Sequence, residues 1–538
     1  MADTTKPSYF VTTPIYYVNA DPHLGTAYST ILADVQARYR RAAGYNVKFL
    51  TGMDEHGEKV AEAAAKHGMT PQEWTDSQAP HFKDLWKTLE ISNDDFIRTT
   101  EPRQYKAVQY LWERMKESGY LYKGSYDGWY CVPDETYFTE TQVEKGDEEN
   151  GTPGAHLCPD CHRPLERVKE ESYFFKLSAF QDRLLKLYDE HPDFVQPEFR
   201  MNEVRSFVEG GLNDLSVSRT SFDWGIPVPF DDGHVTYVWF DALLNYMTAV
   251  GYGCDDDASR AELAYRWPAN LHIVGKDIIR FHCVIWPAML MAIGEALPEH
   301  VFAHGFLTVR NAETGAAEKM SKSRGNAIAP ADVIDLLGVE GYRYYFMTDV
   351  TPGTDGAISF ERMEQVYNAD LANSWGNLIS RSVNMSMKYF DGGSPARPAD
   401  AHAFANPLAD VADGIFGRYS ARMEVLDYAG AKDEAMELIH AANHYIEDSE
   451  PWTLAKDPEK ADELAFVIYN LLEAIRISAH LLAPFMPETS AEALRRIACE
   501  DEIDSDDLAA MCEWGRFAGG VAVEKGDPLF PRLEAKKN

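Results

Sequence analysis

The order of apolar and polar positions in the first part of the chain predicts alternating buried strands and helices. The apolar run YFVTTPIYYV (residues 9–18) has the length of a buried strand, and TILADVQARYRRAAG (residues 30–44) has helical periodicity and ends at a glycine. NVKFLTGMDEHG (residues 46–57) then predicts a second strand and the loop after it. Strand, helix and strand at these lengths form a βαβ unit, so we expect an α/β fold with a parallel sheet.

This alternation stops near residue 121 and returns near residue 231. The stretch between them is rich in aromatic residues and contains a loop of Gly, Asp and Glu, EKGDEENGTPGAH. Strand and helix patterns resume in HVTYVWFDALLNYM (residues 234–247), NLHIVGKDIIRFHCVIWPAMLMAIG (residues 270–294) and HVFAHGFLTV (residues 300–309). A single sheet interrupted by an inserted domain explains this order better than two unrelated α/β domains.

From about residue 359 the strand patterns disappear. Helical periodicity continues in residues 361–390, 430–452 and 461–486, and DGGSPARP (residues 391–398) makes the clearest break. We therefore expect a helical bundle. The predicted domains are residues 1–120 and 231–358 for the two halves of the sheet, 121–230 for the insertion, 359–515 for the bundle and 516–538 for a C-terminal tail.

Length and composition support a multidomain globular protein. The chain has 538 residues, too many for one core, and 45% of them are hydrophobic and 25% charged. No apolar run reaches about 18 residues, and the N-terminus lacks the pattern of a signal peptide. We expect a cytoplasmic protein without a membrane partner.

The net charge is −35 and the pI is about 4.8. On charge alone this argues against a nucleic-acid partner, because phosphate binding needs clustered Lys and Arg. The argument is weak, since net charge does not report a local basic stripe. Part of the acidic surplus is local, in EKGDEEN (residues 144–150) and CEDEIDSDD (residues 499–507).

The sequence NADPHLGT follows the first predicted strand and opens a predicted helix. His23 and Gly25 therefore stand at a helix N-terminus, where backbone N–H groups and the helix dipole attract phosphate. By itself this His-x-Gly pattern is weak, because it occurs by chance in ordinary helix turns.

A second motif, AEKMSKSRGNAI, places Lys319, Ser321 and Lys322 in a short polar loop. Mobile ammonium groups of this kind can stabilise the charge that develops on a phosphate under attack. Taken alone, this sequence is more often a solvated basic loop than a phosphate site. Together with HLG far upstream, the full KMSKS sequence is much more specific.

The two motifs resemble the HIGH and KMSKS signatures of class I aminoacyl-tRNA synthetases, and the resemblance narrows to the methionyl-tRNA synthetases. It covers nearly the whole chain, through TTPIYYVNADPHLG, TGMDEHG, GWYCVPDETYFTE, EESYFF, YVWFDALLNY, GKDIIRFH, FAHGFL, KMSKSRGN, NLISR and EPW. The resemblance implies a Rossmann-type catalytic domain split by a connective insertion, followed by an anticodon-binding bundle. It also implies ligation of L-methionine to tRNA-Met with ATP and Mg²⁺.

The resemblance implies a methionine site in which aromatic rings surround the thioether. Asp54 would bind the α-ammonium group of methionine, an anionic acceptor for a cationic amine. Leu243 stands where some relatives have Pro. The residues implied are Ile15, Tyr17, Asp54, Trp239, Leu243, Tyr246, His282 and Ile285.

The resemblance also implies an ATP site, with Arg219 near the phosphates and Lys322 as the leading lysine for transition-state charge. Thr26 departs from the HIGH pattern, but its hydroxyl can still donate one hydrogen bond from the same helix turn. We therefore predict a working ATP site, in which changing Thr26 to His would not greatly raise activity. The residues implied for ATP binding are His23, Gly25, Thr26, Lys276, Lys319, Ser321 and Lys322, and those implied for catalysis are Lys319, Lys322, His23 and Arg219.

Three of the seven cysteines, together with an aspartate, form two knuckles, Cys131-x-x-Asp134 and Cys158-x-x-Cys161. Facing each other, such knuckles can close a structural tetrahedral Zn²⁺ site. Zinc-binding relatives usually have a second Cys where this chain has Asp134, and His162 is a less favoured fourth ligand. The alternative is a metal-free knuckle. The other four cysteines are expected to be small buried residues rather than parts of a disulfide framework.

In the helical domain the resemblance assigns the tRNA anticodon to Asn377, Arg381 and Trp452. Splayed bases stack on aromatic rings and are hydrogen-bonded at their edges by side chains of this type. Some relatives carry a further C-terminal module that dimerises, and the chain stops soon after the bundle, so we expect a monomer.

Two other hypotheses compete with this interpretation. Another class I synthetase is disfavoured, because a cysteine enzyme would be expected to place thiolates in the catalytic half, and a leucine enzyme would carry a large editing insertion. A non-enzymatic tRNA-binding paralogue with a decayed ATP site would have Thr26 as its first sign. The intact KMSKS motif and Asp54 argue against decay.

Overall fold

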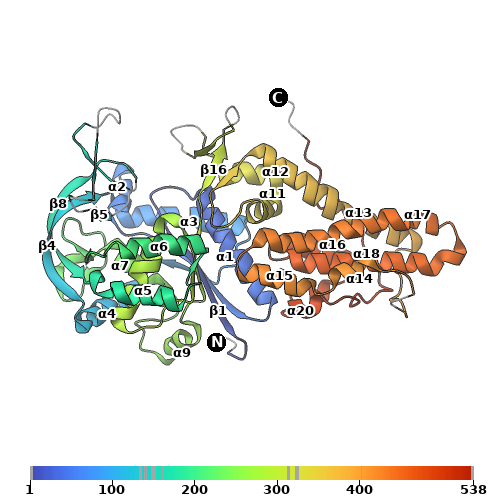
Figure 1. Ribbon diagram of the computed structural model, residues 1–538, viewed down its shortest axis with the longest axis horizontal. Coiled ribbons are helices and arrows are strands. Elements are labelled where there is room, and N and C mark those ends of the chain that lie inside the picture. The colour runs from blue at the N-terminus through green and yellow to red at the C-terminus, as the bar shows by residue number, and fades with distance from the viewer. Residues whose placement is uncertain are drawn as a thin grey trace.

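The protein is elongated, with a central sheet, an insertion at one end and a helical bundle at the other (Figure 1). The computed structural model describes residues 4–132, 136–138, 140, 142–146, 153–159, 161–311, 315–320, 326–400 and 403–534. Within this part the predicted order of sheet, insertion, sheet and bundle is followed along the chain.

Both halves of the predicted α/β domain contribute to one parallel sheet, whose strand order is β3-β2-β1-β14-β15-β9. Pairing of Val11 with Leu271 joins the halves across the insertion. The expected parallel sheet is thereby confirmed. The strands are β1 (Ser8–Tyr17), β2 (Asn46–Asp54), β3 (Asp95–Arg98), β14 (Leu271–Gly275), β15 (His300–His304) and β9 (Val195–Gln196).

The strand order reverses between β1 and β14. From β1 the chain winds outward through β2 and β3, whereas β14 and β15 extend on the other side. At such a switch point the connections leave the sheet in opposite directions, and a crevice opens at the carboxyl ends of the two strands. The HLGT segment directly follows β1 at this crevice.

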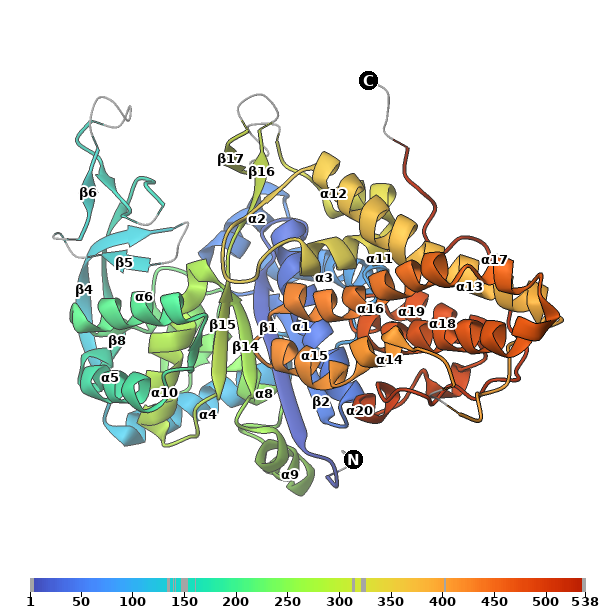
Figure 2. The same ribbon diagram turned by 45° about the vertical axis from the view of Figure 1, so that its right-hand side comes forward.

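Helices cover the sheet and complete this α/β part of the chain. Helix α1 (Leu24–Ala42) is buried along most of its length, because it lies between the sheet and the helical bundle (Figure 2). The Tyr428 hydroxyl of the bundle donates to the carbonyl of Leu32, 2.9 Å away. The other helices of this half are α2 (Glu58–Lys66), α3 (Pro71–Thr88), α4 (Pro102–Ser118), α7 (Val238–Ala242), α8 (Asn245–Thr248), α9 (Asp257–Arg266), a π-helical turn (Phe281–Ile285) and α10 (Trp286–Ile293).

The predicted insertion forms its own antiparallel sheet, in the order β10-β8-β4-β5. Its long strands β4 (Leu121–Cys131) and β8 (Glu166–Phe175) pair over their whole length. The chain then returns to the main sheet before residue 230, since β9 pairs with β15. The remaining elements are β5 (Thr136–Phe138), β6 (Glu144–Lys145), β7 (His156–Leu157), β10 (Leu215–Ser216), α5 (Gln181–Glu190) and α6 (Glu198–Glu209).

Two small sheets connect these parts. One has the order β11-β13-β12, with β11 (Ser218–Arg219), β12 (Pro227–Val228) and β13 (Asp231–Thr236). The other has the order β17-β16-β18, with β16 (Leu307–Arg310), β17 (Ala317–Lys319) and β18 (Gly356–Ile358). The second sheet carries the start of the KMSKS motif, and its β16–β17 hairpin projects above β15 in the view of Figure 2.

The C-terminal region is helical, as the periodicity predicts. The predicted helix 361–390 is α12 (Phe360–Val366), a π-helical segment (Tyr367–Trp375) and α13 (Gly376–Tyr389) in direct succession. The predicted tail packs on the bundle, where the Tyr469 hydroxyl donates to the carbonyl of Phe517. The other helices are α11 (Pro330–Thr348), α14 (Pro407–Ala412), α15 (Ile415–Glu424), α16 (Tyr428–Ser449), α17 (Pro451–Leu454), α18 (Ala461–Leu482), α19 (Pro487–Arg496) and α20 (Leu508–Met511).

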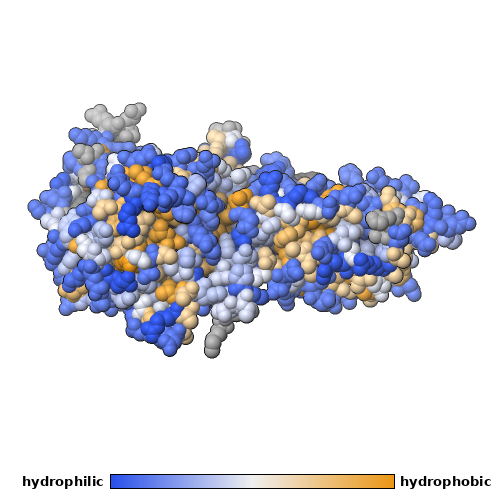
Figure 3. All heavy atoms as spheres, turned by 60° about the horizontal axis from the view of Figure 1, so that its bottom comes forward, coloured by the Kyte–Doolittle hydropathy of each residue, from blue (hydrophilic) through white to orange (hydrophobic). Residues whose placement is uncertain are grey.

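One helix in the described part of the chain, Pro458–Leu482, is long and apolar enough to cross a membrane. It consists of a short 3-10 turn followed by α18, and 94% of its most apolar 18-residue stretch is buried inside the protein, as expected for a core helix of the bundle. Polar residues make up much of the visible surface, and apolar residues appear there in separate patches (Figure 3).

Candidate functional site

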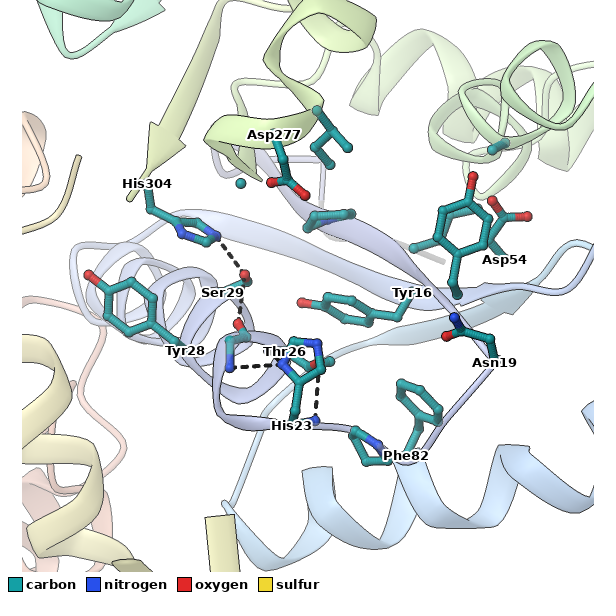
Figure 4. Close-up of a pocket in the computed structure, with 18 of the residues that line it drawn as sticks. Tyr16, Asn19, His23, Thr26, Tyr28, Ser29, Asp54, Phe82, Asp277 and His304 are labelled. Atoms are coloured by element: carbon teal, nitrogen blue, oxygen red, sulfur yellow. Dashed lines mark hydrogen bonds between the residues drawn. The ribbon is translucent and has the colours of Figure 1, made fainter. Parts of the chain in front are cut away.

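A cavity of about 330 Å³ lies at the carboxyl ends of β1 and β14, where the switch point predicts a crevice (Figure 4). Tyr17 and Asp54 end neighbouring strands and are register partners, so both reach the cavity. The lining residues used below are Ile15, Tyr16, Tyr17, Asp21, His23, Gly25, Thr26, Ser29, Asp54, Trp239, Leu243, Tyr246, Asp277, His282, His304 and Phe306.

His23 caps helix α1 with its side chain. Its Nδ1 accepts from the backbone N–H groups of Gly25 and Thr26, at 3.1 and 3.3 Å. In the neutral ring the proton therefore lies on Nε2, which makes that nitrogen a donor. A Cβ on Gly25 would come within 3.1 Å of the His23 ring, so glycine allows the ring to fold over the turn.

Thr26 completes the same cap. Its hydroxyl accepts from the backbone N–H of His23 at 3.3 Å, which closes a capping box around the first turn of α1. The side chain that departs from the HIGH pattern thus helps to build the helix N-terminus. The predicted tolerance of Thr26 by the ATP site stays a prediction.

One wall of the cavity is a set of aromatic and imidazole rings. The Tyr246 hydroxyl lies 2.7 Å from His282 Nε2, and His282 Nδ1 lies 3.1 Å from the carbonyl of Ile278. Because a carbonyl only accepts, Nδ1 carries the proton and Nε2 accepts from Tyr246. Burial lowers the pKa of His282 to about 4, so the ring is neutral at pH 7. Trp239 stacks on Phe281 with ring centroids 3.6 Å apart.

Asp54 stands on a rigid base. The next residue, Glu55, is bonded by Arg98 Nε at 2.6 Å, and its carbonyl accepts from the Trp224 indole N–H at 2.6 Å. His56 Nδ1 lies 2.6 Å from an Asp241 carboxylate oxygen. These hydrogen bonds of the buried residues Glu55 and His56 fix the backbone at the end of β2, so the Asp54 side chain is held facing the cavity.

The structure brings most of the predicted small-molecule residues together. The cavity includes every predicted methionine residue except Ile285, which is buried one helical turn from His282. It also includes His23, Gly25 and Thr26 from the predicted ATP set. Ser321 and Lys322 lie outside the described residues.

The other predicted ATP residues do not line the cavity. The Lys276 ammonium group pairs with Asp355 at 2.7 Å, and Lys319 ends strand β17. Arg219 is buried beside the Tyr237 ring, 3.9 Å from its centroid, and 3.6 Å from a Glu170 oxygen. The predicted roles of these three residues stay predictions.

Sequence reasoning missed a contact between Ser29 and His304. The Ser29 hydroxyl lies 2.6 Å from His304 Nε2 and ties the first turns of α1 to the end of β15 (Figure 4). Burial lowers the pKa of His304. Its position at the end of the apolar strand HVFAH was a usable signal, because polar residues at the carboxyl ends of parallel strands gather at one edge.

The cysteine cluster forms at the tip of the insertion. Sulfur atoms of Cys131, Cys158 and Cys161 all lie within 4.8 Å of one another, and those of Cys131 and Cys161 are 3.5 Å apart. Asp134 lies outside the described residues. His162 is exposed and its Nδ1 contacts Glu144 at 2.7 Å. None of the seven cysteines forms a disulfide.

The predicted anticodon residues belong to helices α13 and α17, which lie at the opposite end of the molecule from the insertion (Figure 1). Asn377 and Arg381 are one turn apart on α13, and an Arg381 nitrogen lies 2.7 Å from a Glu447 oxygen on α16. Trp452 is 37% exposed on α17. Their role in RNA binding stays a prediction.

Family models match almost the whole chain. A model described as tRNA synthetases class I (M) matches residues 9–383, and one described as the anticodon binding domain of methionyl tRNA ligase matches residues 398–538. The first extends past the predicted domain boundary at residue 358 and includes α12 and part of α13. The exact domain boundaries stay a prediction.

Individual proteins match over similar lengths. A methionine–tRNA ligase of Thermotoga maritima is 47% identical over 98% of this chain and 81% of its own length. One of Caldanaerobacter subterraneus is 44% identical over 99% of this chain and 80% of its own length. The structure of Mycobacterium tuberculosis methionyl-tRNA synthetase in complex with methionyl-adenylate has a TM-score of 0.89 and 41% identity, and covers 98% of this chain and 100% of its own.

Proposed function

The chain belongs to the methionine–tRNA ligase family of class I aminoacyl-tRNA synthetases, and on that premise we propose how it activates methionine with ATP and charges tRNA-Met. One observation carries the proposal: the same cavity holds the aromatic wall, Asp54 and the capped helix N-terminus. An amino acid and a nucleotide phosphate would meet there.

The first step joins methionine to the nucleotide. A carboxylate oxygen of methionine attacks the α-phosphorus of ATP, the bond to the β-phosphate oxygen breaks, and pyrophosphate leaves with the electron pair. The carboxylate is itself the nucleophile, so no protein base is needed. Positioning and charge stabilisation are what the chain must supply.

We assign these tasks to residues of the cavity and its rim. Asp54 binds the α-ammonium group, and the ring wall with Tyr246 and His282 receives the thioether. His23 donates from Nε2 to ATP at the N-terminus of α1. The lysines of the KMSKS loop offset the charge of the phosphates, and Mg²⁺ bound with ATP would supply further positive charge there.

In the second step a hydroxyl of the terminal adenosine of tRNA-Met attacks the carbonyl carbon of the adenylate, and AMP leaves. Asn377, Arg381 and Trp452 would contact the anticodon bases. Their support is the helical spacing on α13 and the exposed indole on α17. The monomeric state and the cytoplasmic location stay predictions.

Methionine-dependent ATP–pyrophosphate exchange tests the proposal, with leucine, cysteine and homocysteine as the other amino acids. We expect exchange with methionine far above the other three. No exchange with any of them, from protein that still binds tRNA, would overturn the proposal in favour of a paralogue with a decayed ATP site.

We also propose a structural zinc ion held by Cys131, Cys158 and Cys161, with Asp134 as the fourth ligand. Tetrahedral Zn–S bonds of about 2.3 Å place two ligand sulfurs roughly 3.8 Å apart. The sulfurs of Cys131 and Cys161 are 3.5 Å apart, and all three sulfurs lie within 4.8 Å of one another. The ion would tie the two knuckles together and take no part in the reaction.

Metal analysis of the purified protein tests the zinc proposal. We expect about one zinc per chain and its loss in Cys158→Ser. In Cys283→Ser, which alters a buried cysteine outside the cluster, zinc should be retained. Full zinc retention in Asp134→Ala would show that the carboxylate is not a ligand, and no zinc in the native protein would refute the site.

A further inference from the structure

Phe306 lies at the rim of the cavity, in the turn between β15 and β16. Its ring lines the cavity and is 37% exposed, so one face of it is open to solvent or to a ligand. The backbone on both sides of the ring is fixed. Its N–H donates to Asp355 Oδ1 at 2.9 Å, and its carbonyl accepts from Gly356 N–H at 2.9 Å.

Two lysines from different elements converge on this ring. The Lys276 ammonium group lies 4.5 Å from the ring centroid, and that of Lys319 lies 6.0 Å from it. Lys276 follows β14, whereas Lys319 ends β17. An aromatic face attracts cations at these distances, so the ring offsets part of the repulsion between the two like charges.

Asp355 contacts both Lys276 and the backbone of Phe306. It pairs with Lys276 at 2.7 Å and accepts from the backbone of Phe306. Burial opposes its charged form, but the Lys276 ammonium group and the Phe306 N–H outweigh it and lower the pKa of Asp355. Ring and carboxylate together therefore fix where the Lys276 ammonium group lies.

We propose that Phe306 is a positioning residue that holds the ammonium groups of Lys276 and Lys319 at the rim of the cavity for the phosphates of ATP. This inference rests on the proposed function. Both side chains are long and flexible, so without the ring they would lose rotamer order before the nucleotide arrives.

Substitutions of similar size distinguish the attraction between the aromatic face and the ammonium groups from the effect of side-chain volume. Phe306→Leu keeps an apolar side chain and removes the aromatic face, whereas Phe306→Tyr keeps the face. In pyrophosphate exchange we expect Phe306→Leu to lower kcat/KM for ATP about 3- to 10-fold and to leave KM for methionine unchanged. Phe306→Tyr should stay within about twofold of the native protein.

A double-variant cycle distinguishes a ring that acts through the lysines from one that touches the nucleotide. In a Lys276→Met/Lys319→Met background the loss caused by Phe306→Leu should shrink to less than about twofold, because its partners are gone. The same 3- to 10-fold loss in that background would overturn the proposal, as would equal losses in Phe306→Tyr and Phe306→Leu. Exchange by the native protein is the separate check on the proposed function.

Discussion

We expect Asp54→Asn to lower kcat/KM for methionine in pyrophosphate exchange by about 100-fold, through a higher KM for methionine, with KM for ATP little changed. Asp54 is only 2% exposed and faces the cavity from a rigid strand end. An amide of the same shape offers no negative charge to the α-ammonium group, and an ammonium group taken out of water without a counter-charge is costly.

Asp21→Asn is the matched control for this substitution. Asp21 also lines the cavity, but it is exposed and pairs with His81 at 2.7 Å. We expect its kcat/KM for methionine to stay within about twofold of the native value, because exposed pairs contribute little. If Asp54→Asn left KM for methionine unchanged while its thermal midpoint matched the native one, Asp54 would not be the ammonium ligand.

The sheet could be predicted because its inner strands consist mostly of apolar residues and are mostly buried, as expected for strands covered on both faces. Strands β1, β2, β14 and β15 all follow this rule. β9 could not be predicted, because two residues carry no periodicity. Its place in the sheet depends on the edge of β15, a tertiary contact made from within the insertion.

Ile15, Tyr17, His23 and Asp54 lie in motifs at or just after the carboxyl ends of β1 and β2, where topology alone brings them together. Sequence does not supply their partners. The sequence predicts Lys276 as a phosphate ligand, but only the structure shows that Asp355 and Phe306 contact its ammonium group. The strand HVFAH places His304 at the edge of the sheet, but Ser29 is 275 positions away, so the contact between the two follows only from packing.

Arg343 is a fully buried arginine at the junction between α1 and the helical bundle. Its guanidinium donates to Asp34 Oδ2 at 2.7 Å and to the carbonyls of Leu89, Pro484 and Phe485 at 2.9–3.1 Å. Asp34 lies on α1, the helix whose N-terminus carries His23. Arg343 and Asp34 are both buried, so the favourable interaction between their charges has to offset the cost of removing each charge from water.

We expect Arg343→Met to lower the free energy of unfolding by about 3–5 kcal/mol at pH 7, because Asp34 is left as a buried charge without its main partner. Burial disfavours the charged form of Asp34, yet Arg343, Arg38 and Ser92 outweigh it and lower its pKa to about 2. A lowered folded-state pKa means that the pair stabilises the protein above pH 3.8. That contribution is lost as the pH falls through about 2.

Urea unfolding followed by tryptophan fluorescence measures this loss, and a second substitution tests its cause. Arg343→Met/Asp34→Asn removes both charges of this pair, so the double variant should regain about 1–3 kcal/mol over Arg343→Met. Arg205→Met removes a partly exposed surface arginine that pairs with Asp189 and Glu209, and should cost no more than about 1 kcal/mol. If the double variant were less stable than Arg343→Met, the buried charge of Asp34 would have no measurable cost. The loss of stability would then come from the carbonyls of Leu89, Pro484 and Phe485, which lose their donor.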